Sequence, residues 1–221
     1  MSDGPVLALS GSNLTGDAPF SAALRVGAAL HAAASPPGGR GDLAGLVAGL
    51  CATAGLTPAD VRTVRVDVGP GSYTGLRVAL TFVRFLQRFG AVEVHAVDSL
   101  ALLAARAAAA GPRRAHAVLD ARRDRVHWQA FDVGPTGVVV AAPAAALPLA
   151  EAVARVGAGG FVVAPAALPA ALQAAFAAVG AELALHERVV AAEMFATPLP
   201  FALAAVADLE PRYLMGSYVE D

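Results

Sequence analysis

The chain has 221 residues, of which 57% are apolar and 15% charged, and this composition excludes an intrinsically disordered chain. The formal net charge is −2, and all 16 basic residues are arginine, so there is no overall attraction to nucleic acid or anionic lipid and any contact with RNA must be local. The single cysteine, Cys51, excludes an internal disulfide framework and a cysteine-rich metal site.

The first elements predict an antiparallel start followed by a helix. Val6 to Ser10 is a short apolar run typical of a strand, and residues 20–34 have room for two more strands. The residues before Val6 include no basic side chain, which is unlike a signal peptide. Asp42 stands where an N-cap precedes a helix that runs to about Ala54.

A strand, a glycine-rich loop and a long helix follow. Residues 64–68 are predicted as a strand, the helix runs from about Tyr73 to Phe89, and residues 93–97 are a further strand. Such a unit implies parallel strand pairing. An alanine-rich helix then begins at Asp98 or Ser99 and ends near Gly111. We expect a boundary there, between an N-terminal lobe of residues 1–110 and a C-terminal lobe of residues 111–221.

The second half repeats this order of elements. We predict strands at 115–119, 125–133, 137–140 and 161–164, with a charged turn at 122–124. We also predict a helix before the strand at 161–164, a helix at 168–179 and a final helix before Pro211. Residues 156–181 carry no charge, but Pro165, Pro169 and the many alanines argue against a membrane span. Both halves have antiparallel strands followed by α/β units, as expected of a duplicated actin-like or RNase H-like fold with a reduced second lobe.

The strongest local signal is the run from Val68 to Arg77, which connects a strand to a helix. Glycines permit a sharp turn and close backbone approach, and a helix N-terminus attracts phosphate. However, the run lacks the Lys-Ser/Thr ending of a Walker A motif and the acidic ribose ligand of a dinucleotide fingerprint. Two interpretations stay open: a structural turn, or a phosphate loop made of Gly69, Gly71, Ser72, Thr74, Gly75 and Arg77.

The same run carries a family resemblance. GPGSYTGLR, from Gly69 to Arg77, resembles the GPGSFTGLR signature of the TsaB (YeaZ) family, with Tyr73 in place of phenylalanine. AVDSL at 96–100, LDAR at 119–122 and EPRYL at 210–214 resemble further segments of that family, in the same order. The resemblance implies an actin-like α/β fold and a non-catalytic role in transferring threonylcarbamoyl to the adenosine beside the anticodon of tRNA.

The resemblance also implies the partners. We expect a TsaD-like catalytic subunit and a TsaE-like ATPase to bind, and tRNA to be reached indirectly through the complex. We further expect a cytoplasmic protein that needs no cofactor of its own and has no contact with a membrane.

Two positions argue against independent catalysis. Catalytic relatives carry two histidines at i and i+4 of a helix, where both can bind one metal ion. The matching positions here are Ser99 and Leu103, and leucine cannot be a ligand. Actin-like ATPases and TsaB relatives also usually end the first strand with aspartate, where this chain has Ser10. We therefore predict no metal site and no catalytic residue.

The sequence is also compatible with functions other than a scaffold. The chief alternative is a catalytic actin-like ATPase, sugar kinase or transferase acting on its own, and another is a nucleotide-binding regulator. A peptidase lacks support, because Ser72 lies in no GxSxG elbow and Cys51 falls within a predicted helix. The arginines of one region either contact RNA or form a solvated hairpin end: Arg113, Arg114, Arg122, Arg123 and Arg125.

Two predicted helices have more apolar surface than one sheet can cover. The helix after the loop carries a second apolar stripe: Val78, Phe82, Phe85 and Phe89. The helix at 42–54 carries one apolar stripe, with alanine and glycine behind it: Leu43, Leu46, Val47 and Leu50. A one-sided surface helix needs only about 100° of apolar arc. We predict that these residues bind the catalytic subunit, and that the chain forms a homodimer when it is alone.

Overall fold

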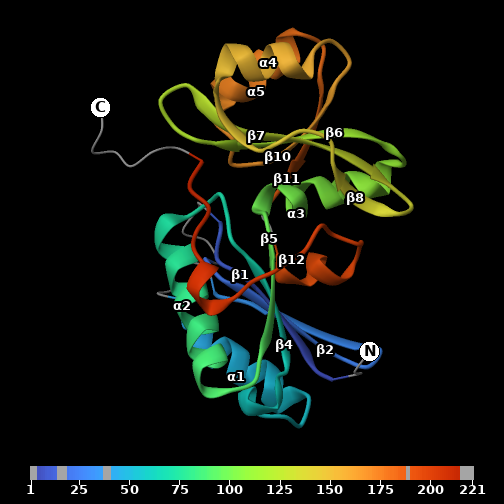
Figure 1. The fold of residues 1–221 in the computed structure, drawn as a ribbon. Helices are drawn as coiled ribbons and strands as arrows, with labels where there is room; N and C mark the ends of the chain where they lie inside the picture. Colours follow the sequence, from blue (N-terminus) through green and yellow to red (C-terminus); the bar gives the residue numbers. More distant parts are fainter. Residues whose placement is uncertain (1–3, 14–18, 37–40, 188–189, 215–221) are drawn as a thin grey trace. The chain divides into compact units, whose positions relative to one another are not determined.

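The computed structural model describes residues 4–13, 19–36, 41–187 and 190–214, and the chain forms two compact units (Figure 1). The first unit comprises Met1–Ser99, Val189–Ala196 and Phe201–Pro211, and the second comprises Leu100–Arg188, Thr197–Pro200 and Arg212–Asp221. The expected lobes, 1–110 and 111–221, differ from these units, because the division falls at Ser99 and C-terminal segments return to the first unit.

The first unit is built on a mixed sheet with the strand order β12-β5-β4-β1-β2-β3. Its strands are β1 (Val6–Ser10), β2 (Ser21–Val26), β3 (Ala29–Ala34), β4 (Thr63–Asp67), β5 (Glu93–Val97) and β12 (Ala202–Leu203). Strands β1 to β3 pair antiparallel and β4 runs parallel to β5, as the sequence predicts. Strand β4 also runs parallel to β1. The carboxyl ends of β1, β4 and β5 therefore lie at one edge of the sheet.

Helices α1 (Leu43–Thr53) and α2 (Tyr73–Phe89) share one core with this sheet, and the short 3-10 helix η1 (Pro58–Asp60) follows α1. Val47 of α1 and Leu80 of α2 both pack in the cluster that contains Leu7 of β1. The predicted N-cap of α1 is confirmed, because the Asp42 carboxylate accepts a hydrogen bond from the Gly45 amide at 2.8 Å.

The predicted helix before Pro211 is wrong. The segment instead contains the 3-10 helices η3 (Ala191–Phe195) and η4 (Val206–Asp208) and the strand β12, which pairs antiparallel with β5. The Ala204 amide donates to the Val94 carbonyl at 2.9 Å. Tertiary pairing prevails over alanine's helix propensity here, because the edge of β5 would otherwise leave backbone groups without partners.

The second unit has a sheet with the order β11-β10-β6-β7-β8, and β9 also pairs with β7. Its strands are β6 (Arg113–Asp120), β7 (Arg125–Gly134), β8 (Gly137–Val140), β9 (Ala145–Pro148), β10 (Phe161–Pro165) and β11 (Glu182–His186). The sequence predicted neither β9 nor β11, because both are short and rich in alanine or leucine, without strong β-branched alternation.

Helices α4 (Leu149–Val156) and α5 (Ala170–Ala178) lie together over this sheet (Figure 1), and Trp128 and Phe176 belong to the core between them and the strands. The remaining elements are α3 (Ser99–Ala105) and the 3-10 helix η2 (Arg106–Ala110). The uncharged stretch 156–181 forms β10 and α5, and within the described residues no helix is long and apolar enough to cross a membrane.

Candidate functional site

The glycine-rich loop lies at the carboxyl ends of β1, β4 and β5, where open α/β sheets commonly place their sites. Two of its glycines pack against the backbone that follows β1. A Cβ atom on Gly75 would lie 2.1 Å from the Gly11 carbonyl oxygen, and one on Gly71 would lie 2.3 Å from the Ser12 carbonyl oxygen. Both glycines are therefore required by close approach of two backbone segments.

The loop uses several of its amides for its own structure. Ser72 donates its amide to the Ser12 carbonyl at 2.8 Å, and its hydroxyl accepts the Gly75 amide at 3.2 Å as the N-cap of α2. Gly69 donates its amide to the Asp67 carboxyl at 2.9 Å. Thr74 and Arg77 are exposed, and the Arg77 guanidinium lies 4.1 Å from the centre of the Tyr73 ring. These contacts favour the structural turn, and phosphate binding stays a prediction.

Asp67, at the end of β4, is the functional-site residue that the sequence analysis missed. Its carboxyl group is fully buried, and it accepts hydrogen bonds from the hydroxyls of Ser10 at 2.8 Å and Ser99 at 2.5 Å. The Ser12 hydroxyl and the Gly69 amide also bond to it. The signal that could have found it is a lone aspartate between an apolar strand and a glycine-rich loop, at the carboxyl edge of the sheet.

The Asp67 carboxyl also corrects the interpretation of Ser10. The first strand ends with Ser10 in place of the usual aspartate, but the Asp67 carboxyl of the neighbouring strand lies 2.8 Å from the Ser10 hydroxyl. The carboxyl group comes from β4 instead of β1. Burial raises the pKa of Asp67 above its usual value, and the surrounding hydrogen bonds oppose that rise.

The residues weighed for catalysis are engaged elsewhere. Ser99 bonds to Asp67, and Leu103 is buried within α3. Cys51 is fully buried in α1, and burial raises the pKa of its thiol, which disfavours the thiolate that a nucleophile needs. Among the described residues, no three His, Cys, Asp or Glu side chains gather where they could hold a metal ion.

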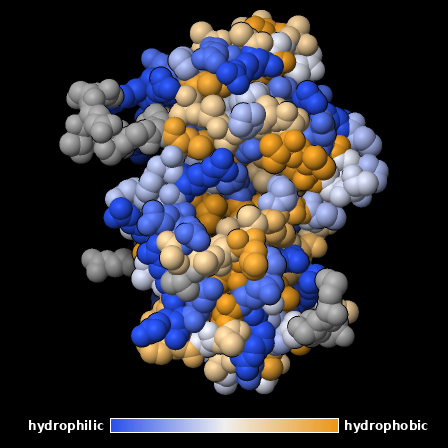
Figure 2. Space-filling model, in the orientation of Figure 1, coloured by the Kyte–Doolittle hydropathy of each residue, from blue (hydrophilic) through white to orange (hydrophobic). Residues whose placement is uncertain are grey.

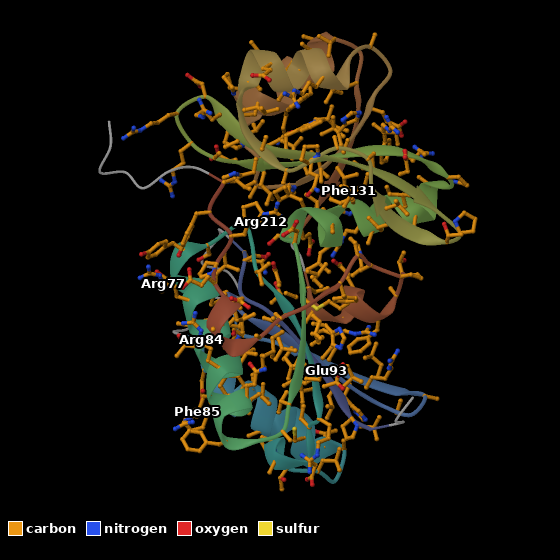
Figure 3. The ribbon with its side chains drawn as sticks, in the orientation of Figure 1. Arg77, Arg84, Phe85, Glu93, Phe131 and Arg212 are labelled. Carbon is orange, nitrogen blue, oxygen red and sulfur yellow. The ribbon has the colours of Figure 1, made fainter. Side chains whose placement is uncertain are left out.

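The second apolar stripe of α2 reaches the surface. Val78 is 41% exposed, Phe85 60% and Phe89 75%, and the rings of Phe85 and Phe89 lie 4.6 Å apart. Figure 3 shows Phe85 projecting outward from α2. Phe82 is half-buried and packs against the core of the first unit. On the face drawn in Figure 2, hydrophobic residues are otherwise interspersed with hydrophilic ones.

The apolar stripe of α1 was predicted to form a contact surface, but the structure places most of it in the core. Leu43, Val47 and Leu50 are buried in the core, and Leu46 is half-buried against it. The exposed face of α1 consists of small residues: Ala44, Gly45, Ala48, Gly49 and Ala52. The sequence separates the two faces correctly, but the prediction that the large apolar residues contact a partner is wrong, because these residues pack into the core. The three buried residues belong to the core and not to a contact surface.

The arginines of the second unit are not one cluster. Arg113 and Arg114 begin β6 and form ion pairs with Glu182 and Asp132. At the opposite end of that strand, Arg122 and Arg123 occupy the exposed β6–β7 turn. Arg125, at the start of β7, donates to the Ala146 carbonyl at 2.8 Å. Of these five arginines, only Arg122 and Arg123 therefore lie exposed at the turn that joins β6 to β7.

Comparisons with known proteins agree with this geometry. A family described as TsaD, tRNA N6-adenosine threonylcarbamoyltransferase, matches residues 41–215. The structure of YeaZ from Pseudomonas aeruginosa is 25% identical, with 87% of this chain and 89% of that chain covered and a TM-score of 0.67.

A second crystal structure, of an uncharacterized protein with similarity to peptidase YEAZ from Pseudomonas aeruginosa, is 23% identical. The match covers 96% of this chain and 100% of that chain with a TM-score of 0.71, and it bears on the fold alone. No curated protein matches the chain. The predicted actin-like, RNase H-like α/β fold is confirmed.

Proposed function

The chain belongs to the YeaZ (TsaB) group of the TsaD family, and on that premise we propose that it is a non-catalytic scaffold subunit. Its complex transfers threonylcarbamoyl to the adenosine beside the anticodon of tRNA. The observation that carries the proposal is the exposed aromatic stripe of α2. Large apolar side chains aligned on one helix face typically mark a contact with another protein.

The partners follow from the same premise. We infer that a TsaD-like subunit supplies the catalytic residues and that a TsaE-like ATPase joins the complex, so that tRNA binds mainly to the assembly. The cytoplasm is the expected compartment, because tRNA is modified there and the single cysteine is compatible with a reducing environment.

The buried site of the first unit supports a structural role. The donors around Asp67 are serine hydroxyls and a backbone amide, and the carboxyl itself is inaccessible to solvent. A general base must reach its substrate within hydrogen-bond distance. Asp67 instead joins the ends of β1 and β4 and the start of α3 through the hydrogen bonds of Ser10, Gly69 and Ser99.

The proposed contact surface consists of the exposed stripe and the small-residue face of α1. Val78, Phe85 and Phe89 provide large exposed side chains, and Phe82 of the same helix is half-buried against the core. Burying each large side chain contributes about 1.5–3 kcal/mol, before the entropic cost of association. The same surface can serve a catalytic subunit or a second copy of this chain.

The contact is tested by combining Phe85→Glu with Phe89→Arg. The two charges stand at i and i+4 on α2, so they support the helix while removing the apolar stripe. We expect light scattering to show a monomer and pull-down of the catalytic subunit to weaken at least about 100-fold, since both aromatic anchors are lost. Leu30→Glu, an exposed apolar residue on β3, is the matched control and should leave both unchanged.

Catalysis is tested by reconstitution with the threonylcarbamoyl donor and tRNA. The chain alone should give no modified adenosine and hold no stoichiometric metal by elemental analysis. Addition of the catalytic subunit and the ATPase should give product. Modification by the chain alone would favour the alternative of an independent catalytic actin-like enzyme.

A further inference from the structure

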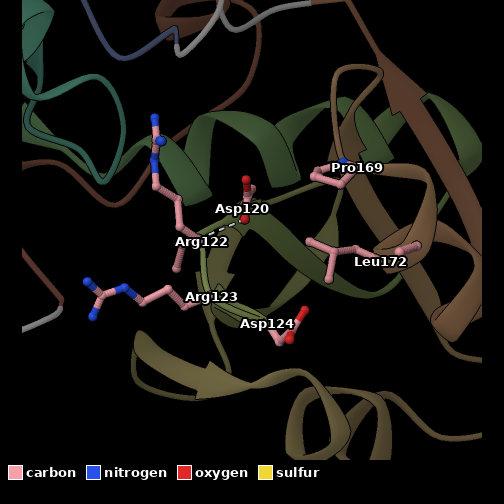
Figure 4. Close-up of a pocket in the computed structure, with 8 residues that line it drawn as sticks. Asp120, Arg122, Arg123, Asp124, Pro169 and Leu172 are labelled. Atoms are coloured by element: carbon pink, nitrogen blue, oxygen red, sulfur yellow. Dashed lines mark hydrogen bonds between the residues drawn. The ribbon is translucent and has the colours of Figure 1, made fainter.

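A cavity of about 630 Å³ opens in the second unit between the β6–β7 turn and the start of α5 (Figure 4). Its volume is in the range that holds a drug-sized or nucleotide-sized ligand. Pro169 and the buried Leu172 of α5 form an apolar wall, and the turn residues from Asp120 to Asp124 form the opposite wall.

The turn has an unusual backbone. Arg122, Arg123 and Asp124 have φ angles of 64°, 51° and 55°, so three consecutive residues other than glycine adopt the left-handed region. That conformation is unfavourable for residues with a Cβ atom, and strain of this kind concentrates at binding sites. The turn is held in place by the Asp120 carboxylate, which accepts the Arg122 amide at 2.7 Å.

The left-handed turn places its positively charged side chains and its Asp124 carboxylate on opposite sides (Figure 4). In Figure 4 the guanidinium groups of Arg122 and Arg123 extend away from Pro169 and Leu172, while the Asp124 carboxylate lies on the other side of the turn. The cavity thus combines an apolar wall, a carboxylate acceptor and, along its rim, two exposed cations.

We propose that this cavity holds one unpaired ribonucleotide of an RNA chain, an inference that rests on the proposed function only in taking RNA as the substrate. The face of the base lies on Pro169 and Leu172, a ribose hydroxyl donates to Asp124, and the flanking phosphates bind Arg122 and Arg123. Unpaired bases, 2′-hydroxyls and phosphates are the groups by which single-stranded RNA is recognised.

The arrangement favours RNA over a free mononucleotide. Arg122 and Arg123 are both exposed at the rim, so they can reach phosphates that continue on either side of the cavity. A mononucleotide site would instead bury its phosphate cradle among backbone amides.

The test is fluorescence anisotropy of the full chain with a short labelled hairpin RNA that has an unpaired loop, measured over a series of salt concentrations. Arg122→Gln with Arg123→Gln should weaken binding and reduce the slope of log K against log salt by about 0.7 per arginine. The charge-retaining pair Arg122→Lys and Arg123→Lys should keep most of that slope. Arg114→Gln, at the opposite end of β6, is the matched control and should bind RNA as the parent does.

Asp124→Gly tests the ribose contact, because glycine accepts the left-handed φ at this position. The parent chain should bind the RNA hairpin more tightly than the DNA hairpin of the same sequence. In the variant, the ratio of these two affinities should be smaller. Unchanged affinity and slope in the glutamine pair, or full displacement of the hairpin by AMP, would overturn the proposal.

A pull-down of the catalytic subunit separates this inference from the proposed scaffold role. The glutamine pair should capture the subunit as well as the parent does, because the cavity and the α2 stripe belong to different units. If only the α2 variant loses capture of the subunit, the scaffold role is supported. If only the turn variants lose RNA binding, the RNA site in the cavity is supported.

Discussion

Asp67 is a buried carboxyl group whose hydrogen bonds determine its contribution to stability. Asp67→Ala would remove the acceptor of the Ser10 and Ser99 hydroxyls and of the Gly69 amide. Each unsatisfied buried donor costs about 1–3 kcal/mol, so we expect the free energy of unfolding to fall by at least that amount in urea denaturation. Asp67→Asn keeps an acceptor oxygen and should cost less; equal losses in the two variants would contradict this account.

The same residue sets a dependence on pH. Burial raises the folded-state pKa of Asp67 above the ordinary value of 3.8, so the folded state binds the proton more tightly than the unfolded state does. The part of the stability that comes from proton binding at this carboxyl is therefore fully present below pH 3.8 and is lost as pH rises through the folded-state pKa. Asp67→Asn should lack this dependence.

His127 has the opposite dependence. Burial lowers its pKa from 6.5 to about 4, so the folded state holds the neutral imidazole and the unfolded state takes up the proton first. The protein should lose stability as pH falls from 6.5 towards 4. His127→Gln should reduce the drop in melting temperature between pH 7 and pH 5, whereas His31→Gln on β3 is the control and should retain it.

At the scale of elements, the fit between the loop and the segment after β1 depends on glycine. Gly75→Ala would place Cβ 2.1 Å from the Gly11 carbonyl oxygen, and neither backbone can move freely, so we expect a loss of about 1–3 kcal/mol by denaturation. Gly49→Ala is the matched control, because Gly49 lies inside α1 with nothing within 4 Å of its added Cβ. That change should stabilise the protein by about 0.5–1 kcal/mol, since alanine favours the helix.

Replacing a left-handed residue of the β6–β7 turn by glycine should increase the stability of the protein and weaken its RNA binding. Arg123→Gly relieves a left-handed residue and should raise the free energy of unfolding by about 1 kcal/mol, while RNA affinity falls with the lost charge. Gly157→Ala makes the reverse change, because it adds a Cβ atom at a left-handed residue, with φ 69° and open space around it. This change should lower the free energy of unfolding by about 1 kcal/mol. A turn variant that gains no stability in thermal unfolding would show that the turn is not strained.

The elements also show where sequence reasoning succeeds and fails. The helix from Tyr73 to Phe89 and the antiparallel start could be predicted because large apolar residues and glycines mark their bounds. The segment containing Ala202–Leu203 could not, because its conformation is decided by the open edge of β5. The face of α1 that packs into the core was predicted wrongly for a related reason, since the sequence alone does not show which apolar stripe the sheet covers.

At the scale of the whole molecule, the site follows from tertiary contacts that no single motif contains. The glycine-rich run was recognisable from its sequence, but its partner segments after β1 and β5 are distant in the chain. Arg84 of α2 likewise donates to the Leu209 carbonyl at 2.7 Å, which joins the C-terminal segment to the helix that carries the aromatic stripe. The sequence therefore indicates the loop and the stripe, and the fold explains why α2 begins and lies where it does.

The stripe on α2 predicts that homodimer and heterodimer compete. If a second copy of this chain and the catalytic subunit both cover Phe85 and Phe89, each must leave before the other can bind. Adding the catalytic subunit to the homodimer should therefore release monomers into a heterodimer, and the apparent dissociation constant should rise with the total concentration of this chain. Light scattering coupled to size-exclusion chromatography measures both quantities. The Leu30→Glu control should show the same competition, because its altered residue lies on β3. A stable assembly in which two copies of this chain still contact each other through α2 while the catalytic subunit is bound would contradict a shared surface.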